Sequence, residues 1–122
     1  MPTMDQLPAR EEPASPNVAI ANAIVRLYRT HFGRGPTKAR AILNGDVVAV
    51  LLEDVLTTAE KTLVERGHTD QVVEQRMILQ YAIAEEFTGA VEDATGRKVR
   101  LFVSGVNAVA SSASELFALE PE

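Results

Sequence analysis

The sequence predicts a single α+β domain in two layers, with helices on one face of a four-stranded, mostly antiparallel sheet. Three features of the sequence support this prediction. Apolar residues recur at helical spacing in three segments, alternate with polar residues in others, and an Asn44-Gly45 pair separates two strand-like segments as in a tight hairpin. A chain of 122 residues is long enough for one hydrophobic core and too short for two.

The first helix is predicted to begin at Ser15-Pro16 and to end at Gly33. Serine caps the free amides of a first turn, proline suits the first helical position, and glycine suits the left-handed residue that follows a helix. Residues 1–15 contain three prolines and no apolar period. We therefore expect a flexible N-terminal tail there and the domain over residues 16–122.

The remaining elements complete the order α-β-β-α-α-β-β. Val47 to Leu52 is almost continuously apolar, so we expect this strand at the centre of the sheet. Thr57 and Glu60 have the spacing of a capping box at a helix start. The expected ranges are strands at 38–43, 47–52, 98–103 and 115–119, and helices at 57–66 and 69–94.

Charge is distributed unevenly along the chain. No acidic residue occurs between Pro13 and Gly45, whereas fourteen acids and six bases follow from Asp46 onward. The net charge of −5 therefore belongs to the C-terminal two thirds. The basic segment either forms one patch or is neutralised by acids that fold back onto it; its members are Arg26, Arg29, Arg34, Lys38 and Arg40.

Strict alternation predicts the side chains on the uncovered face of the sheet. Lys38, Arg40 and Ile42 would share one side of the first strand, as Lys98, Arg100 and Phe102 would share one side of the third. We therefore expect a basic face with apolar islands. Covering such a face favours self-association, at least to a dimer. The residues expected at this interface are Ile42, Phe102 and Phe117.

The loop from Gly33 to Lys38 has two interpretations. Glycines let backbone amides approach an anion, and Arg34 and Lys38 supply positive charge. The spacing is not that of a P-loop, and the same residues suit a helix stop followed by entry into a strand. If an anion or an acidic partner binds, the expected contacts are Arg34, Gly35, Lys38, Arg40, Lys98 and Arg100.

Few residues indicate catalysis or metal binding. The chain has no cysteine, which removes thiolate nucleophiles and thiolate ligands and fits a reducing, cytoplasmic compartment. Its two histidines, His31 and His68, are not spaced as metal ligands, and His31 suits a packed, hydrogen-bonded position. No serine lies in a nucleophile elbow. We expect no catalytic site, no metal and no cofactor.

Two further features concern the helices and the membrane. Arg76 interrupts the apolar side of its helix, so its side chain either pairs with a buried carboxylate or reaches solvent. The longest strongly apolar run, Val47 to Leu52, is far shorter than the roughly 20 residues of a membrane helix, and no secretory signal is evident. Any membrane association is therefore expected to be peripheral, at the inner face.

Several segments between residues 18 and 121 together resemble the MpsC-like bacterial family. A run of such segments in the right order is more specific than any one of them. The chain departs from the family between Val106 and Ser114, where it has small residues in place of an acidic, proline-containing turn. The matching segments are residues 27–29, 32–38, 45–48, 55–61, 87–92, 95–99 and 115–121.

The resemblance implies a soluble component of a sodium-translocating, membrane-potential-generating system, in a family known largely as a domain of unknown function and without assigned catalytic residues. It favours a non-enzymatic interaction subunit, a homo-oligomer beside a membrane ion-translocation or transport complex. The alternative is a binding module for a small anion or for nucleic acid that uses the basic segment 26–40. An acidic pI of about 5.0 disfavours nucleic acid. No residue pattern names a reaction for an enzyme.

Overall fold

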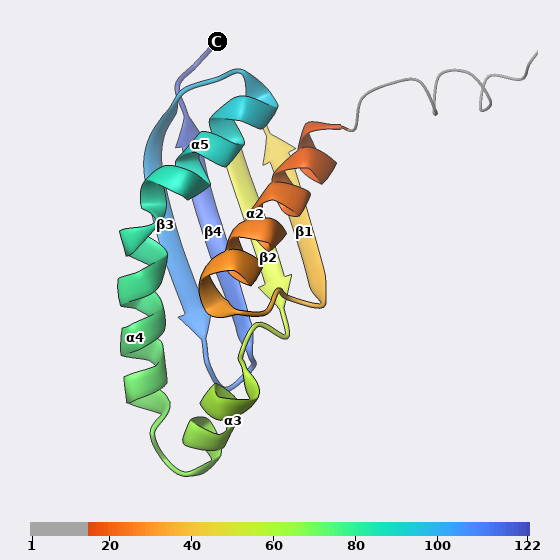
Figure 1. The fold of residues 1–122 in the computed structure, drawn as a ribbon. Coiled ribbons are helices and arrows are strands. Elements are labelled where there is room, and N and C mark those ends of the chain that lie inside the picture. The colour runs from red at the N-terminus through yellow and green to blue at the C-terminus, as the bar shows by residue number, and fades with distance from the viewer. Residues whose placement is uncertain (1–14) are drawn as a thin grey trace, which may run out of the picture.

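The computed structural model describes residues 15–122, which form four helices and one four-stranded antiparallel sheet (Figure 1). The predicted α+β class is confirmed. The tail predicted over residues 1–15 lies outside the described residues except for Ser15. The helices are α2 (Pro16–Phe32), α3 (Thr58–Glu65), α4 (Thr69–Ala82) and α5 (Ala84–Thr95), and the strands are β1 (Lys38–Asn44), β2 (Val47–Glu53), β3 (Val99–Asn107) and β4 (Ser112–Leu119).

The sheet has the strand order β1-β2-β4-β3, so the two hairpins join through β2 and β4. This order places β2 in the interior of the sheet, as its apolar sequence predicts. Helices α2, α4 and α5 lie on the same side of the sheet, α3 lies beyond one end, and the other sheet face carries no described element (Figure 1). The fold therefore has one covered face and one open face.

The core lies between the covered face and the helices. Helix α2 begins at Ser15, whose side chain accepts a hydrogen bond from the Val18 amide, and ends at Gly33, whose φ of 84° is left-handed. Its buried stripe faces the sheet and lies closest to β1, and alternate residues of the strands point toward the helices. The fully or almost fully buried apolar side chains there are Ile20, Ile24, Tyr28, Val48, Val50, Leu52, Phe87, Val91, Phe117 and Leu119.

The β1–β2 hairpin turns one residue later than predicted. Asn44 pairs with Val47, so the two-residue loop is Gly45-Asp46 rather than Asn44-Gly45. A type I′ turn needs positive φ at both loop residues, whereas only Gly45 has it, at 62°. Glycine at the first loop position is typical of a type II′ turn, so Gly45 supplies the required conformation.

The helix predicted over residues 69–94 is broken in two at Ile83. The backbone there, at φ −105° and ψ 22°, ends α4 and begins α5. A straight helix of that length would measure roughly 39 Å, longer than the roughly 30 Å of the longest strand. The break lets α4 run beside β3 and α5 cross back over the sheet (Figure 1), which keeps both apolar stripes against the core.

A β-bulge changes the alternation of β3. The pairing skips from Val99 opposite Leu119 to Leu101 opposite Ala118, which leaves Arg100 as the extra residue. Val99 and Phe102 therefore both pack against the core, although they are three residues apart. The expectation that Phe102 shares an exposed side with Lys98 and Arg100 is wrong, because strict alternation does not hold across the bulge.

Candidate functional site

A cluster of polar side chains lies buried on the covered face, around Glu115 of β4. The Tyr28 hydroxyl of α2 donates a hydrogen bond to Glu115 Oε2 at 2.5 Å, and the Ser104 hydroxyl of β3 donates to Oε1 at 2.5 Å. The Gln80 amide of α4 donates to Ser104 Oγ at 2.6 Å. The carboxyl of Glu115, which is 0% exposed, thus links two helices to two strands.

The surroundings of this cluster favour a neutral carboxyl. Burial raises the pKa of Glu115 to about 7, although the hydrogen bonds from Ser104 and Tyr28 act in the opposite direction. Burial and the neighbouring Glu115 carboxyl also raise the pKa of the Tyr28 phenol. A perturbed carboxyl is a common mark of an active site. Here it faces packed side chains rather than a cleft, so a substrate has no access to it.

Arg76 on α4 forms a second buried polar contact, with Glu60 of α3. Its Nε and Nη2 donate to the two oxygens of Glu60 at 2.7 and 2.5 Å, and Nη2 also donates to the Val55 carbonyl at 2.9 Å. The guanidinium carbon lies 3.8 Å from the centre of the Phe32 ring. Of the two positions predicted for Arg76, the structure shows the ion pair. Burial would raise the pKa of Glu60, but hydrogen bonds from Arg76 and Thr57 outweigh it and lower that pKa.

The glycine-rich loop after α2 turns its arginine toward the protein. Arg34 donates to Asp54 Oδ2 at 3.0 Å and to the Leu56 carbonyl at 2.6 Å. Hydrogen bonds from Arg34 and Lys61 lower the pKa of Asp54 to about 2. A Cβ at Gly35 would lie 3.4 Å from Val25 on α2, so this glycine lets the loop pass close to the helix. Arg34 therefore fixes the segment after β2, and its charge is already paired.

The other basic residues do not gather around this loop. Lys38 and Arg40 lie exposed on β1, on the open face of the sheet. Arg26 lines a groove between the helices of the covered side. Lys98 and Arg100 are exposed at the start of β3, at the opposite edge of the sheet from β1. The basic segment is thus divided between the two sides of the sheet.

The two phenylalanines predicted at an interface belong to the interior. Phe117 is fully buried, and Phe102 is half-buried with its ring centre 5.1 Å from that of Phe117 and 5.8 Å from that of Phe87. Their placement at the interface is therefore wrong, because Phe117 lies at a buried position of β4 and the bulge directs Phe102 inward. Ile42 lies on the open face as predicted.

His31 and His68 are accounted for by the fold. Nε2 of His31 lies 3.0 Å from Oε2 of Glu86, but the two atoms lack hydrogen-bond geometry, so within residues 15–122 this nitrogen does not form the hydrogen bond expected for His31. His68 is the residue before α4 and makes no side-chain cap. Within residues 15–122, no three His, Cys, Asp or Glu side chains are grouped as metal ligands would be.

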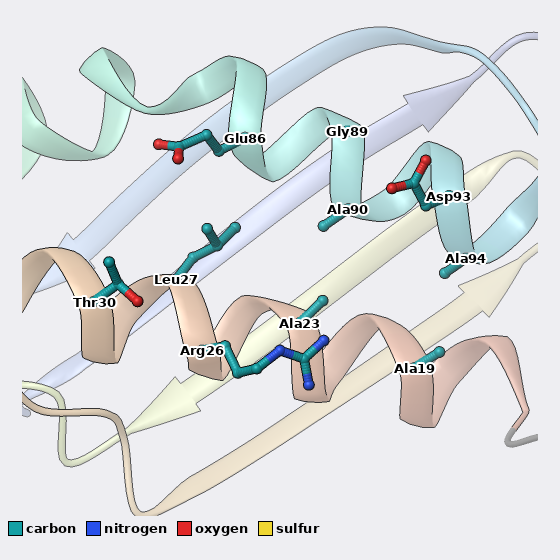
Figure 2. Close-up of a pocket in the computed structure, with 10 residues that line it drawn as sticks. All are labelled: Ala19, Ala23, Arg26, Leu27, Thr30, Glu86, Gly89, Ala90, Asp93 and Ala94. Atoms are coloured by element: carbon teal, nitrogen blue, oxygen red, sulfur yellow. The ribbon is translucent and has the colours of Figure 1, made fainter.

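A groove runs between α2 and α5 on the covered side. Figure 2 shows Ala23 of α2 and Ala90 of α5 pointing toward each other across it, with Arg26, Glu86 and Asp93 at its sides. Small side chains on both helices allow their close approach, and a Cβ at Gly89 would meet no atom within 4 Å. This groove is an outcome of helix packing, and its walls carry charges of both signs.

The open sheet face is the largest unexplained feature of the described residues. It carries six large apolar side chains that are each between 42% and 51% exposed. Soluble proteins seldom leave so many contiguous large apolar groups in water without a binding role. The six are Ile42, Val47, Leu51, Leu101, Val103 and Leu116.

On the open face, residues that pair across the four strands lie side by side and form a grid of four rows. Each row is given in the order β1, β2, β4, β3. The first two rows hold five of the six large apolar groups, and the last two hold charged, polar or small residues apart from the sixth, Leu51. The apolar rows are Asn44, Val47, Ala118, Leu101 and then Ile42, Ala49, Leu116, Val103. The polar rows are Arg40, Leu51, Ser114, Gly105 and then Lys38, Glu53, Ser112, Asn107.

A family model for the MpsC component of a Na+-translocating, membrane potential-generating system matches residues 15–121. The chain belongs to the MpsC family. The family description connects the chain with a membrane system, and no helix among residues 15–122 is long and apolar enough to cross a membrane. No curated protein and no solved structure matches the chain.

Sequence reasoning missed both the buried cluster and the extent of the apolar face. Along β4, Ala113, Glu115 and Phe117 alternate with Ser114 and Leu116, so each side contains both polar and apolar residues and the pattern does not decide which is buried. A clearer signal was the run from Val47 to Leu52. It is apolar on both faces, whereas the chain covers only one of them.

Proposed function

We propose that this chain is a non-enzymatic interaction subunit of a Na+-translocating, membrane potential-generating system, and that it contacts protein partners through the open sheet face. The observation that carries the proposal is the exposed apolar half of that face, centred on Leu116. Family membership supplies the system. We further propose a peripheral position at the cytoplasmic side of the membrane, which the absence of cysteine supports.

Two features support a binding role over a catalytic one. Glu115 and Tyr28, the groups whose pKa values are raised most strongly, are fully buried. They therefore stabilise the fold and are not accessible to a substrate. The exposed apolar side chains, in contrast, are held on a rigid sheet, which lowers the entropy lost when a partner binds. The division of the basic residues between two sides of the sheet removes support for the anion or nucleic-acid alternative.

The test uses the tagged full-length chain and native membranes of its source cell. Leu116→Glu places a charge at the centre of the apolar rows and is expected to abolish capture of the Na+-translocating components and to lower the membrane potential in cells that depend on the variant. The matched control is Val109→Glu, because Val109 is 80% exposed in the loop between β3 and β4.

The two variants distinguish a charge placed on the open face from a charge placed elsewhere on the surface. Retained capture and potential with Val109→Glu, together with their loss in Leu116→Glu, would support the proposal. Equal capture by wild type and both variants would refute the role of the open face. A turnover reaction that survives Leu116→Glu would refute the non-enzymatic role.

A further inference from the structure

We propose that the occupant of the open face is a second copy of the chain, packed face to face about a two-fold axis that runs parallel to the strands between β2 and β4. This inference rests on the proposed function, because it names one partner of the same face. Two sheets pack well when their inner faces lie about 10 Å apart with nearly aligned strands. The proposed axis gives this arrangement.

The distribution of polarity selects this axis over the other in-plane two-fold. An axis parallel to the strands keeps each row of the grid opposite the same row of the partner, so apolar rows meet apolar rows. An axis perpendicular to the strands reverses the rows and places Val47 against Glu53 and Ile42 against Arg40. That arrangement sets apolar side chains against charged ones and loses the contact between apolar rows that would stabilise the interface.

Side-chain sizes are also complementary about the proposed axis. The axis places β2 of one copy over β4 of the other, so Leu116 faces Ala49 and Leu51 faces Ser114 in the same rows. It also places β1 over β3, so the long Arg40 side chain faces Gly105. Alternation of large and small groups lets two faces interdigitate without voids. Glu53 then faces Ser112, at the polar edge.

The size of the face predicts a weak, reversible dimer. Four strands about 4.8 Å apart and seven residues at about 3.3 Å each give a face of roughly 19 by 23 Å. This flat area of roughly 440 Å² per copy is about half of the roughly 800 Å² per partner in a standard interface. Association should therefore depend on concentration, and exchange between copies should be rapid enough to mix variants.

The first test is sedimentation of the full-length chain over a wide concentration range. Wild type and Val109→Glu are expected to shift from monomer to dimer as concentration rises, whereas Leu116→Glu is expected to remain monomeric. A wild-type chain that stays monomeric at every concentration would overturn the dimer. The membrane capture described above then still decides the proposed function, because a monomer can bind another partner through the same face.

The second test determines the arrangement with engineered thiols, which are unambiguous because the chain has no cysteine. A mixture of Ala49→Cys and Leu116→Cys chains is expected to form a mixed disulfide dimer at a yield above that of either variant alone. About the perpendicular axis, Ala49 of one copy would instead face Leu51 of the other, so a mixture of Ala49→Cys and Leu51→Cys chains tests that arrangement. A higher yield from this second mixture would refute the strand-parallel axis, even if the wild-type chain dimerises.

Discussion

A sheet with one exposed face usually buries apolar residues and exposes polar ones. The two faces of this sheet depart from that pattern. The covered face encloses a carboxyl, a phenol and an amide, whereas the open face exposes six large apolar groups. The buried polar groups are tolerated because most of their hydrogen-bonding capacity is met by protein neighbours. The apolar groups of the open face have no such compensation within residues 15–122. We therefore propose the uncovered apolar face, rather than the buried polar cluster, as the binding surface.

The largest effect is expected from breaking the buried ion pair between α4 and α3. Arg76→Ala leaves Glu60 partly buried without its charged partner, which should lower the free energy of unfolding by about 3–5 kcal/mol. Urea unfolding measures this loss. Arg29→Ala on the exposed side of α2 is the control and should change stability little. A loss below about 1 kcal/mol for Arg76→Ala would show that the pair contributes little.

Two adjacent leucines on β2 point to opposite faces of the sheet, so substitutions at these two positions compare the faces directly. Leu52 is fully buried and Leu51 is half exposed, although they are adjacent in the sequence. Leu52→Ala is expected to cost about 2–5 kcal/mol of stability, because it leaves a cavity in the core. Leu51→Ala should cost less than about 1 kcal/mol in dilute solution. Similar losses in dilute solution, where the chain is monomeric, would mean that the open face is packed within the monomer.

The pH dependence of stability tests the carboxyl of Glu115. Its pKa is about 7 in the folded chain and 4.5 ordinarily, so the folded state binds more protons between these values. Its contribution to stability is therefore fully present below pH 4.5 and is lost as pH rises toward and through 7, by about 3 kcal/mol in total. Chemical unfolding between pH 4 and 8 measures this change.

Glu115→Gln supplies the control for that titration. The amide keeps the size of the side chain and removes the ionisable group, so the fall in stability between pH 4.5 and 7 should be much reduced. If wild type and Glu115→Gln show the same pH profile, the carboxyl is not the titrating group. An increase in stability over that range would contradict the raised pKa.

A smaller effect is expected at the loop after α2. Arg34→Gln removes the hydrogen bond to the Leu56 carbonyl and the pair with Asp54, and should cost about 1 kcal/mol. Lys38→Gln on the open face should leave thermal stability unchanged, because this exposed side chain makes no hydrogen bond or ion pair within residues 15–122. Equal melting temperatures for both variants and wild type would show that Arg34 does not hold the loop.

Much of the fold could be predicted because local signals decide it. The serine cap and the left-handed Gly33 bound α2, and the Thr57-Glu60 capping box begins α3 as predicted. The break at Ile83 and the bulge at Arg100 were not predictable, because both depend on how the elements fit over the sheet. Strict alternation therefore places Phe102 on the wrong face. The sequence does not identify the partner of Arg76 for the same reason, since Glu60 is distant in sequence.

The most direct test of the account is whether the open face is covered in the cell. Chains with Leu116→Cys or Val109→Cys are expressed in the source cell in place of the wild-type chain and exposed to a membrane-permeant maleimide. We predict that the thiol at position 116 is protected in cells and reactive in the dilute purified chain, whereas the thiol at position 109 reacts in both. Equal labelling of the two positions in cells would contradict the claim that a partner covers this face.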